Sequence, residues 1–283
     1  MASPAPFQRI GVAGLGLIGG SVALAAKSVW PDVVVRGCDA AAHVGDARAR
    51  GVVSDGAPDI AALASCDVIV LAVPLGSMHD VLQQLGRIRT DAVITDVGST
   101  KRRIVATAKD VGLRQFVGGH PMAGGERPGL DRARADLFVD RPWLLVEGTA
   151  DADARARVDA FVRGLGARPS WMDAAAHDRT VAYVSHLPQV VAAALMTAAD
   201  ETLGIDGKSA AGPAFAEMTR LASSPPDMWT SVLAENADFV AEALAQFARD
   251  LPSVADLQSG AWARDVLSRA GETRARWRSA RER

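Results

Sequence analysis

The sequence predicts an α/β protein: an N-terminal Rossmann-type domain with a doubly wound, mostly parallel sheet, followed by an all-α C-terminal domain. Three observations predict this. Short Val- and Ile-rich runs alternate with Ala-rich stretches as far as residue 172, a glycine-rich turn follows the first run, and long helical patterns take over after Asp173. Apolar runs without in/out alternation are typical of strands covered on both faces, with helices as crossovers.

We expect the strands at Arg9–Ala13, Val33–Cys38, Val68–Val73, Ala92–Asp96, Phe116–Gly118, Trp143–Glu147 and Arg168–Met172. The expected helices of the second half are Ala174–Leu203, Ser209–Ser223, Asp227–Ala248 and Leu251–Arg281. Pro188 lies inside the first of these patterns and must kink it or free a carbonyl. The change of character predicts a dinucleotide-binding domain at 1–172 and a helical domain at 173–283.

Composition excludes several classes of function. The 283 residues carry 31 Lys and Arg against 33 Asp and Glu, so no strong field exists to hold nucleic acid or an anionic membrane. Cys38 and Cys66 cannot form a disulfide framework, and no Cys/His spacing indicates zinc or another metal. The first residues do not resemble a signal peptide, and the longest apolar tract, 190–199, is about half of what spans a bilayer. We therefore expect a cytoplasmic protein.

The motif GLGLIG follows the first expected strand directly and opens a helix. Gly14 permits the tight turn, Gly16 lets the backbone approach a pyrophosphate, and Gly19 lets the helix pack closely on the strand. Leu17 and Ile18 complete the expected cofactor-binding turn. The free N–H groups of the helix N-terminus favour phosphate there.

An acidic residue after the second expected strand indicates which dinucleotide binds. Asp39 lies near the usual offset for a carboxylate that hydrogen-bonds the ribose 2′-hydroxyl of NAD and repels the 2′-phosphate of NADP. The sequence therefore predicts NAD as the cofactor. Val73 and Pro74 are expected to line the cofactor crevice, although Pro74 fits an ordinary strand terminator equally well.

Two polar residues follow the expected fourth and fifth strands. The strand order 3-2-1-4-5-6 places these strands beside the first, and ligands bind outside the carboxyl ends of such strands. Ser99 and His120 therefore fall where a hydride acceptor would lie. A neutral His can accept the hydroxyl proton of an alcohol that is being oxidised, and a Ser can orient it.

Other polar residues have simpler interpretations. Asp96 and Lys101, on either side of Ser99, can be a structural salt bridge. His43, His79 and His177 lack a glycine-rich context and are interpreted as surface residues.

These motifs resemble the prephenate/arogenate dehydrogenase family of tyrosine biosynthesis. GLGLIGGS, DVGSTK, GGHPMAG, SHLP, and the stretch from Thr219-Arg220 through Met228-Trp229 to Asn236 occur in the family's order and cover nearly the whole chain. GGHPMAG together with SHLP at this separation is specific. The resemblance implies NAD-dependent oxidative decarboxylation of prephenate to 4-hydroxyphenylpyruvate, of arogenate to tyrosine, or of both. It also implies a homodimer through the helical domain.

The resemblance assigns roles to individual residues. His120 would accept a hydrogen bond from the ring C4 hydroxyl, Ser99 would assist it, and His186 would line the substrate side near the nicotinamide. Arg220 would bind a substrate carboxylate, and Glu126 resembles the family's gating acid.

Alternatives stay open at this point. Arg220 can instead pair with Glu217, three residues earlier on a mostly apolar helix that we expect to be buried. Gln189 and Gly125 depart from the family pattern, which leaves tyrosine inhibition and the choice between prephenate and arogenate open. A β-hydroxyacid dehydrogenase or imine reductase with the same two-domain plan is one alternative function. A nonenzymatic NAD-sensing protein is another.

Overall fold

One sheet organises the first part of the chain in the computed structural model, which describes residues 4–125 and 127–281, with the backbone alone at 205–208 and 281. The described strands run in the order β3-β2-β1-β4-β5-β6-β7-β8. All neighbours pair in parallel except β6 and β7. The strands are β1 (Arg9–Ala13), β2 (Val34–Cys38), β3 (Asp55–Ala57), β4 (Val68–Leu71), β5 (Val93–Asp96), β6 (Phe116–Pro121), β7 (Pro142–Val146) and β8 (Arg168–Met172). The predicted doubly wound, mostly parallel sheet is confirmed.

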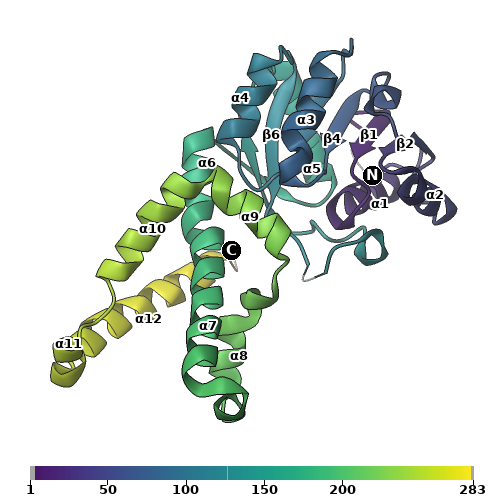
Figure 1. The fold of residues 1–283 in the computed structure, drawn as a ribbon. Helices are drawn as coiled ribbons and strands as arrows, with labels where there is room; N and C mark the ends of the chain where they lie inside the picture. The colour runs from purple at the N-terminus through teal and green to yellow at the C-terminus, as the bar shows by residue number, and fades with distance from the viewer. Residues whose placement is uncertain (1–3, 126, 282–283) are drawn as a thin grey trace. The chain divides into compact units, whose positions relative to one another are not determined.

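Helices cover both faces of the sheet (Figure 1). The first core lies under α1 (Leu17–Val29), α2 (Ala41–Ala49) and α5 (Ala152–Gly164). The second lies under η1 (Ile60–Leu63), α3 (Leu75–Gly86) and α4 (Arg102–Asp110). Strand residues alternate between the two cores, as Ile69 and Val70 do on β4. Both faces are therefore apolar, which explains the unbroken Val and Ile runs.

Strand β3 was not predicted, and it changes the neighbours of β1. Asp55–Ala57 has no apolar run, and it pairs with β2 through Gly56, where a side chain would lie 2.6 Å from the Gly37 carbonyl oxygen. The expectation that β1 lies beside 92–96 is wrong, because β4 lies between them. The register still aligns the strand ends, with Ala13 opposite Cys38 and Leu71, and Leu71 opposite Asp96.

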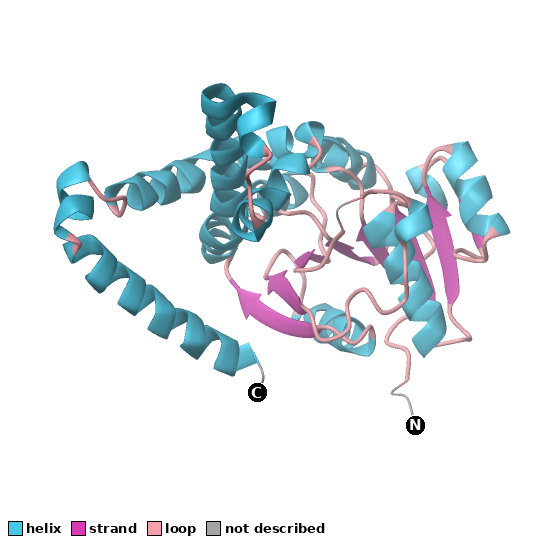
Figure 2. Cartoon of the chain, turned by 90° about the horizontal axis from the view of Figure 1, so that it is seen from below, coloured by secondary structure: helices cyan, strands magenta, loops and turns pink. Residues whose placement is uncertain are grey.

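From Ala174 onward the described chain is helical or loop (Figure 2). Its elements are α6 (Ala174–Val181), the π-turn η3 (Ala182–His186), α7 (Leu187–Lys208), α8 (Pro213–Thr219), η4 (Arg220–Ser223), α9 (Pro226–Glu235), α10 (Ala237–Arg249), α11 (Val254–Ser259) and α12 (Ala261–Arg281). The predicted all-α second part is confirmed. The π-turn ends at His186, two residues before Pro188, so the expected local disturbance of that helix is present.

The helix from Ala174 to Gly204 is long and apolar enough to cross a membrane by length and composition, with a mean hydropathy of 1.3 in its most apolar window. It also carries three buried polar residues, His177, Asp178 and His186, which are hydrogen-bonded to other parts of the fold. Each of these residues makes a hydrogen bond within the fold, and buried polar groups of this kind are costly against lipid. We therefore interpret this helix as part of the folded domain.

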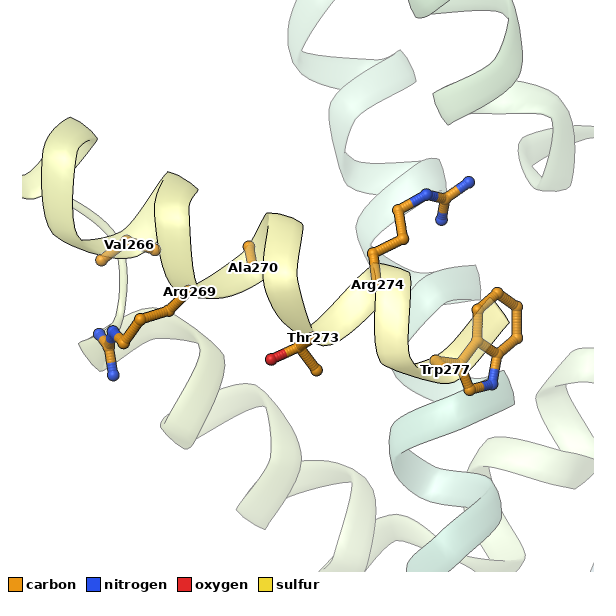
Figure 3. A pocket seen from close by; sticks show the side chains of 6 residues that line it. All are labelled: Val266, Arg269, Ala270, Thr273, Arg274 and Trp277. Carbon is orange, nitrogen blue, oxygen red and sulfur yellow. The ribbon is translucent and has the colours of Figure 1, made fainter. Parts of the chain in front are cut away.

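The chain forms two compact units, Met1–Val240 and Ala241–Arg283. In the second, Ser253 caps α11 by a reciprocal capping box with Asp256. Trp262 donates its indole N–H to the Asp250 carbonyl over 2.9 Å. A shallow hollow runs along one stretch of α12, lined by Val266, Arg269, Ala270, Thr273, Arg274 and Trp277 (Figure 3). All six come from one helix, so the hollow is a helix surface and has no convergent chemistry.

Candidate active site

The glycine-rich turn between β1 and α1 has the geometry of a phosphate cradle. Gly14 has a φ of 92°, and a Cβ there would lie 2.3 Å from the Ala72 carbonyl oxygen. A Cβ at Gly19 would lie 1.9 Å from the Gly14 oxygen, so the helix can pack on the strand only without one. A Cβ at Gly16 would meet no atom within 4 Å, and no side chain caps the N-terminus of α1. Open space before uncapped N–H groups fits a pyrophosphate.

Asp39 lies against this turn at the end of β2. Its Oδ2 accepts the Leu15 N–H over 2.7 Å, and its Oδ1 accepts the Ala40 N–H and contacts His43 Nδ1 at 2.9 Å. Burial opposes the charge, but these hydrogen bonds outweigh it and hold the pKa of Asp39 below its usual value. An ionised carboxylate here fits a ribose hydroxyl and opposes a 2′-phosphate, as expected from the sequence.

Val73 and Pro74 lie in the loop after β4, which ends at Leu71, two residues earlier than predicted. Pro74 is the N-cap of α3, and Val73 packs on the second core. Because Ala13 and Leu71 are opposite each other, this loop follows the strand next to the glycine-rich turn.

His120 lies near the end of β6 and contacts a second histidine. Its Nδ1 is 3.0 Å from His177 Nε2, and His177 Nδ1 is 2.8 Å from Asp178 Oδ1. His177 is fully buried, so its interpretation as a surface residue is wrong. His79, also assigned to the surface, is half-buried between Thr107 and Glu235. His43 is exposed, as predicted.

Asp178 connects α6 to the start of α4. Its Oδ1 accepts the Lys101 N–H over 2.7 Å, and its Oδ2 accepts the Arg102 N–H over 3.0 Å and the Arg102 Nε–H over 3.1 Å. The Asn236 amide donates to the Asp178 carbonyl over 2.7 Å. These bonds hold the His177 backbone at a fixed place relative to the edge of the sheet.

Lys101 and Asp96 form a fully buried ion pair beneath this cluster. Asp96 also accepts the N–H groups of Gly98 and Gly119, so it fixes the loop after β5 against β6. Burial lowers the pKa of Lys101, and the attraction of Asp96 opposes this. The structural interpretation of the pair is therefore confirmed. Ser99 lies in this same loop and is half-buried.

The electrostatic surroundings keep His120 uncharged. Burial lowers the pKa of His120 well below its usual value, and the neighbouring His177, Lys101 and His186 add to the effect. A neutral imidazole at neutral pH can accept a hydrogen bond.

His186, at the end of the π-turn, presents a buried donor. Its Nδ1 lies 3.2 Å from the Asn236 amide nitrogen, which can only donate, so the ring proton is on Nε2. Among the described residues, neither His186 Nε2 nor the indole nitrogen of Trp229 has a hydrogen-bond partner, and the two rings meet edge to face at 5.8 Å. Burial lowers the pKa of His186 to about 4. Two buried N–H donors without partners fit the oxygens of a ligand.

Comparison with known proteins assigns these features to one family. The family model for the prephenate dehydrogenase nucleotide-binding domain matches residues 22–170, and the model for the prephenate dehydrogenase dimerization domain matches residues 173–264. The chain belongs to the prephenate dehydrogenase family.

Individual members of the family agree with this. The prephenate dehydrogenase of Lactococcus lactis is 32% identical over 256 residues, which are 88% of this chain and 71% of that protein. The A. aeolicus prephenate dehydrogenase, solved with hydroxyphenyl propionate and NAD⁺, has a TM-score of 0.87 at 26% identity, covering 96% of this chain and 98% of that one. The Synechocystis arogenate dehydrogenase gives 0.82 at 28% identity, with 95% and 99% covered. The predicted family and fold are confirmed.

The remaining residues expected to bind substrate in this prephenate dehydrogenase family member are less enclosed. Arg220 opens η4 and is exposed, and α8 before it has no buried residue, so the expectation of a buried helix is wrong for this chain. Buried Gln189 donates to the Leu221 carbonyl over 2.8 Å and accepts from the Ser224 hydroxyl over 3.1 Å. It therefore fastens the segment after Arg220 to α7. Glu126 lies outside the described residues.

Sequence reasoning missed His177 and Asp178. They are nine and eight residues before His186, and nine residues on a regular α-helix turn through about 900°, which puts the two histidines on opposite faces. The intervening π-turn adds a residue to the helical repeat and changes that relation. The adjacent His-Asp pair at the start of the first helix after the sheet was the available signal.

Proposed function

We propose that the chain catalyses the NAD-dependent oxidative decarboxylation of prephenate, of arogenate or of both, with His120 as the acceptor for the ring hydroxyl. The observation that carries this proposal is a half-buried, neutral His120 in the same sheet as the phosphate cradle, close to the strand ends that follow it. Family membership supports the reaction, because the named relatives are prephenate and arogenate dehydrogenases.

The cofactor is NAD. It supplies the hydride acceptor when bound. We propose that the residues that hold it are Gly14, Gly16, Leu17, Ile18, Gly19, Asp39, Val73 and Pro74. The cradle at Gly16 and the charge on Asp39 support this assignment.

His120, helped by Ser99, polarises the C4 hydroxyl as hydride leaves C4. The C1 carboxylate then departs as CO₂ and the ring becomes aromatic. The hydroxyl proton stays on the phenolic product, so the reaction releases no net proton. A neutral acceptor of low pKa suits this balance, because it draws charge toward the oxygen without removing the proton for good. Aromatisation supplies the driving force, so the protein mainly orients the reactants.

We assign His186, Arg220 and Glu126 to the substrate. The unpartnered Nε2–H of His186 can donate to a substrate oxygen, and an Arg pairs well with a carboxylate in two parallel hydrogen bonds. Both prephenate and arogenate carry carboxylates, so this donor set fits either.

We further propose a cytoplasmic homodimer formed through the helical domain, with the domain boundary at residue 172. The second family model is a dimerization domain. Apolar side chains are exposed on α7 and neighbouring elements, which is typical of a surface that another subunit covers. They include Tyr183, Val184, Leu195 and Leu203. Light scattering should then give twice the chain mass of 29.5 kDa.

The testing experiment follows NADH absorbance with purified protein and NAD⁺ or NADP⁺, offering prephenate and arogenate separately. Turnover with NAD⁺ and either substrate is the expected result. His120→Asn should lower kcat by about 10²- to 10⁴-fold, the range of general acid–base catalysis, and leave the NAD dissociation constant nearly unchanged. Absence of turnover in protein that binds NAD would reject the proposed reaction and favour another small hydroxy acid or imine.

A further inference from the structure

Two buried residues near His120 have no role in the reaction as described so far. His177 and Asp178 are 0% and 1% exposed. They form a chain with the proposed acceptor: His120 Nδ1 to His177 Nε2 at 3.0 Å, then His177 Nδ1 to Asp178 Oδ1 at 2.8 Å. The chain runs from the sheet edge into the protein.

The charge on Asp178 determines which atoms donate and which accept along this row of hydrogen bonds. Burial opposes its charge, but hydrogen bonds from His177 and from the N–H groups of Arg102 and Lys101 hold the pKa of Asp178 below its usual value. An ionised carboxylate only accepts hydrogen bonds. His177 must therefore carry a proton on Nδ1.

Whether Nε2 of His177 donates or accepts a hydrogen bond then depends on the charge of the ring. Burial lowers the pKa of His177; nearby Lys101 adds to this, while Asp178 and Asp96 oppose it. A neutral ring protonated on Nδ1 has a bare Nε2, which can only accept. The facing Nδ1 of His120 must then be the donor, and His120 Nε2 is left with a free lone pair. Were His177 charged, it would donate instead and place the proton of His120 on Nε2.

We propose that His177 and Asp178 are positioning residues that hold His120 as the Nδ1-protonated tautomer, so that Nε2 accepts the substrate hydroxyl. The hydrogen bond at one ring nitrogen sets the chemistry of the other. The catalytic part of this inference rests on the proposed function, whereas the tautomer is a property of the free protein.

The tautomer can be observed directly. The chain has five histidines, so ¹⁵N-histidine labelling gives a tractable set of ring nitrogens in long-range ¹H–¹⁵N NMR spectra. The spectrum of the wild-type protein should show His120 protonated on Nδ1 and bare on Nε2, and His177 the same. A His120 ring protonated on Nε2 would overturn the proposal, whether or not the protein turns over prephenate.

Two substitutions at one position separate positioning from packing. In His177→Gln the side-chain oxygen can still accept from His120 Nδ1, whereas His177→Leu has no acceptor. We expect His177→Leu to move the His120 proton toward Nε2 and to lower kcat about 10- to 100-fold, as loss of an orienting partner does. His177→Gln should keep the wild-type tautomer and most of the kcat.

His79→Leu is the matched control, because it removes a half-buried histidine bonded to Thr107 and Glu235 and not to His120. It should lower the melting temperature without changing the His120 tautomer. Equal losses of kcat in His177→Gln and His177→Leu, with the His120 tautomer unchanged in both, would reduce His177 to a packing residue.

Discussion

At the scale of single residues, Asp39 holds the glycine-rich turn and is also the carboxylate proposed to bind the ribose of the cofactor. Its two oxygens accept the N–H groups of Leu15 and Ala40 and contact His43. A carboxylate offers about four lone-pair sites, so Oδ2 keeps one for a ribose hydroxyl. The same charge disfavours a second phosphate in its place.

Asp39→Ala should therefore raise the KM for NAD⁺ about tenfold, the loss expected from one charged hydrogen bond, and narrow the preference for NAD⁺ over NADP⁺. Initial rates with both cofactors measure this. Asp46→Ala, which removes an exposed carboxylate paired with Arg50 on α2, is the matched control and should change neither value. An unchanged cofactor preference in Asp39→Ala would contradict the assigned role.

At the scale of elements, the turn between β1 and α1 contains a glycine that packing requires, Gly19, and a glycine that we propose faces the cofactor, Gly16. A side chain at Gly19 meets the Gly14 carbonyl oxygen at 1.9 Å, whereas a side chain at Gly16 meets nothing within 4 Å. Gly16 has a φ of −83°, which alanine adopts without strain.

Gly19→Ala should destabilise the protein by about 3 kcal/mol, because a methyl group is forced into backbone, and should lower Tm by several degrees. Gly16→Ala should keep the wild-type Tm and weaken NAD binding, because its methyl group occupies the space open to the pyrophosphate. Thermal denaturation and NAD titration of both variants measure this. Equal Tm losses in the two variants would disprove the distinction.

At the scale of the whole molecule, three neighbouring histidines, two buried and one half-buried, are held without charge. Burial lowers the pKa of His120, His177 and His186, the last to about 4. These groups take up protons more readily in the unfolded chain, where the pKa is near 6.5. Stability from this source is present at higher pH and is lost as pH falls below about 6.5.

We therefore expect Tm to fall between pH 7 and pH 5, above the range in which carboxylates titrate. His186 alone should account for a loss on the order of 2 kcal/mol over this interval. Calorimetry across the interval measures the effect, and His186→Gln should show a shallower slope. A Tm that stays constant from pH 7 to pH 5 would contradict the buried neutral state.

How far the sequence predicted this protein depends on the range of the interaction involved. Gly14, Gly16 and Asp39 were predicted as cofactor-binding residues from local spacing, since turn geometry belongs to consecutive residues, and that role stays a prediction. The strand Asp55–Ala57 was missed because it has no apolar run and forms only where the edge of β2 accepts it. Arg220 was expected on a buried helix because the surrounding sequence is mostly apolar. An apolar pattern does not show whether this chain or a partner covers the helix.

The sequence by itself determined the fold class, the family and the glycine-rich turn. Hydrophobic period, glycine positions and motif order are local properties of the sequence and can be read without knowing the tertiary contacts. Only the tertiary structure decided what surrounds His120. His177 lies 57 residues from His120, and Asn236 lies 58 residues from Asp178. Their contact depends on sheet register and on a π-turn in the following helix, and neither leaves a periodic signal in the sequence.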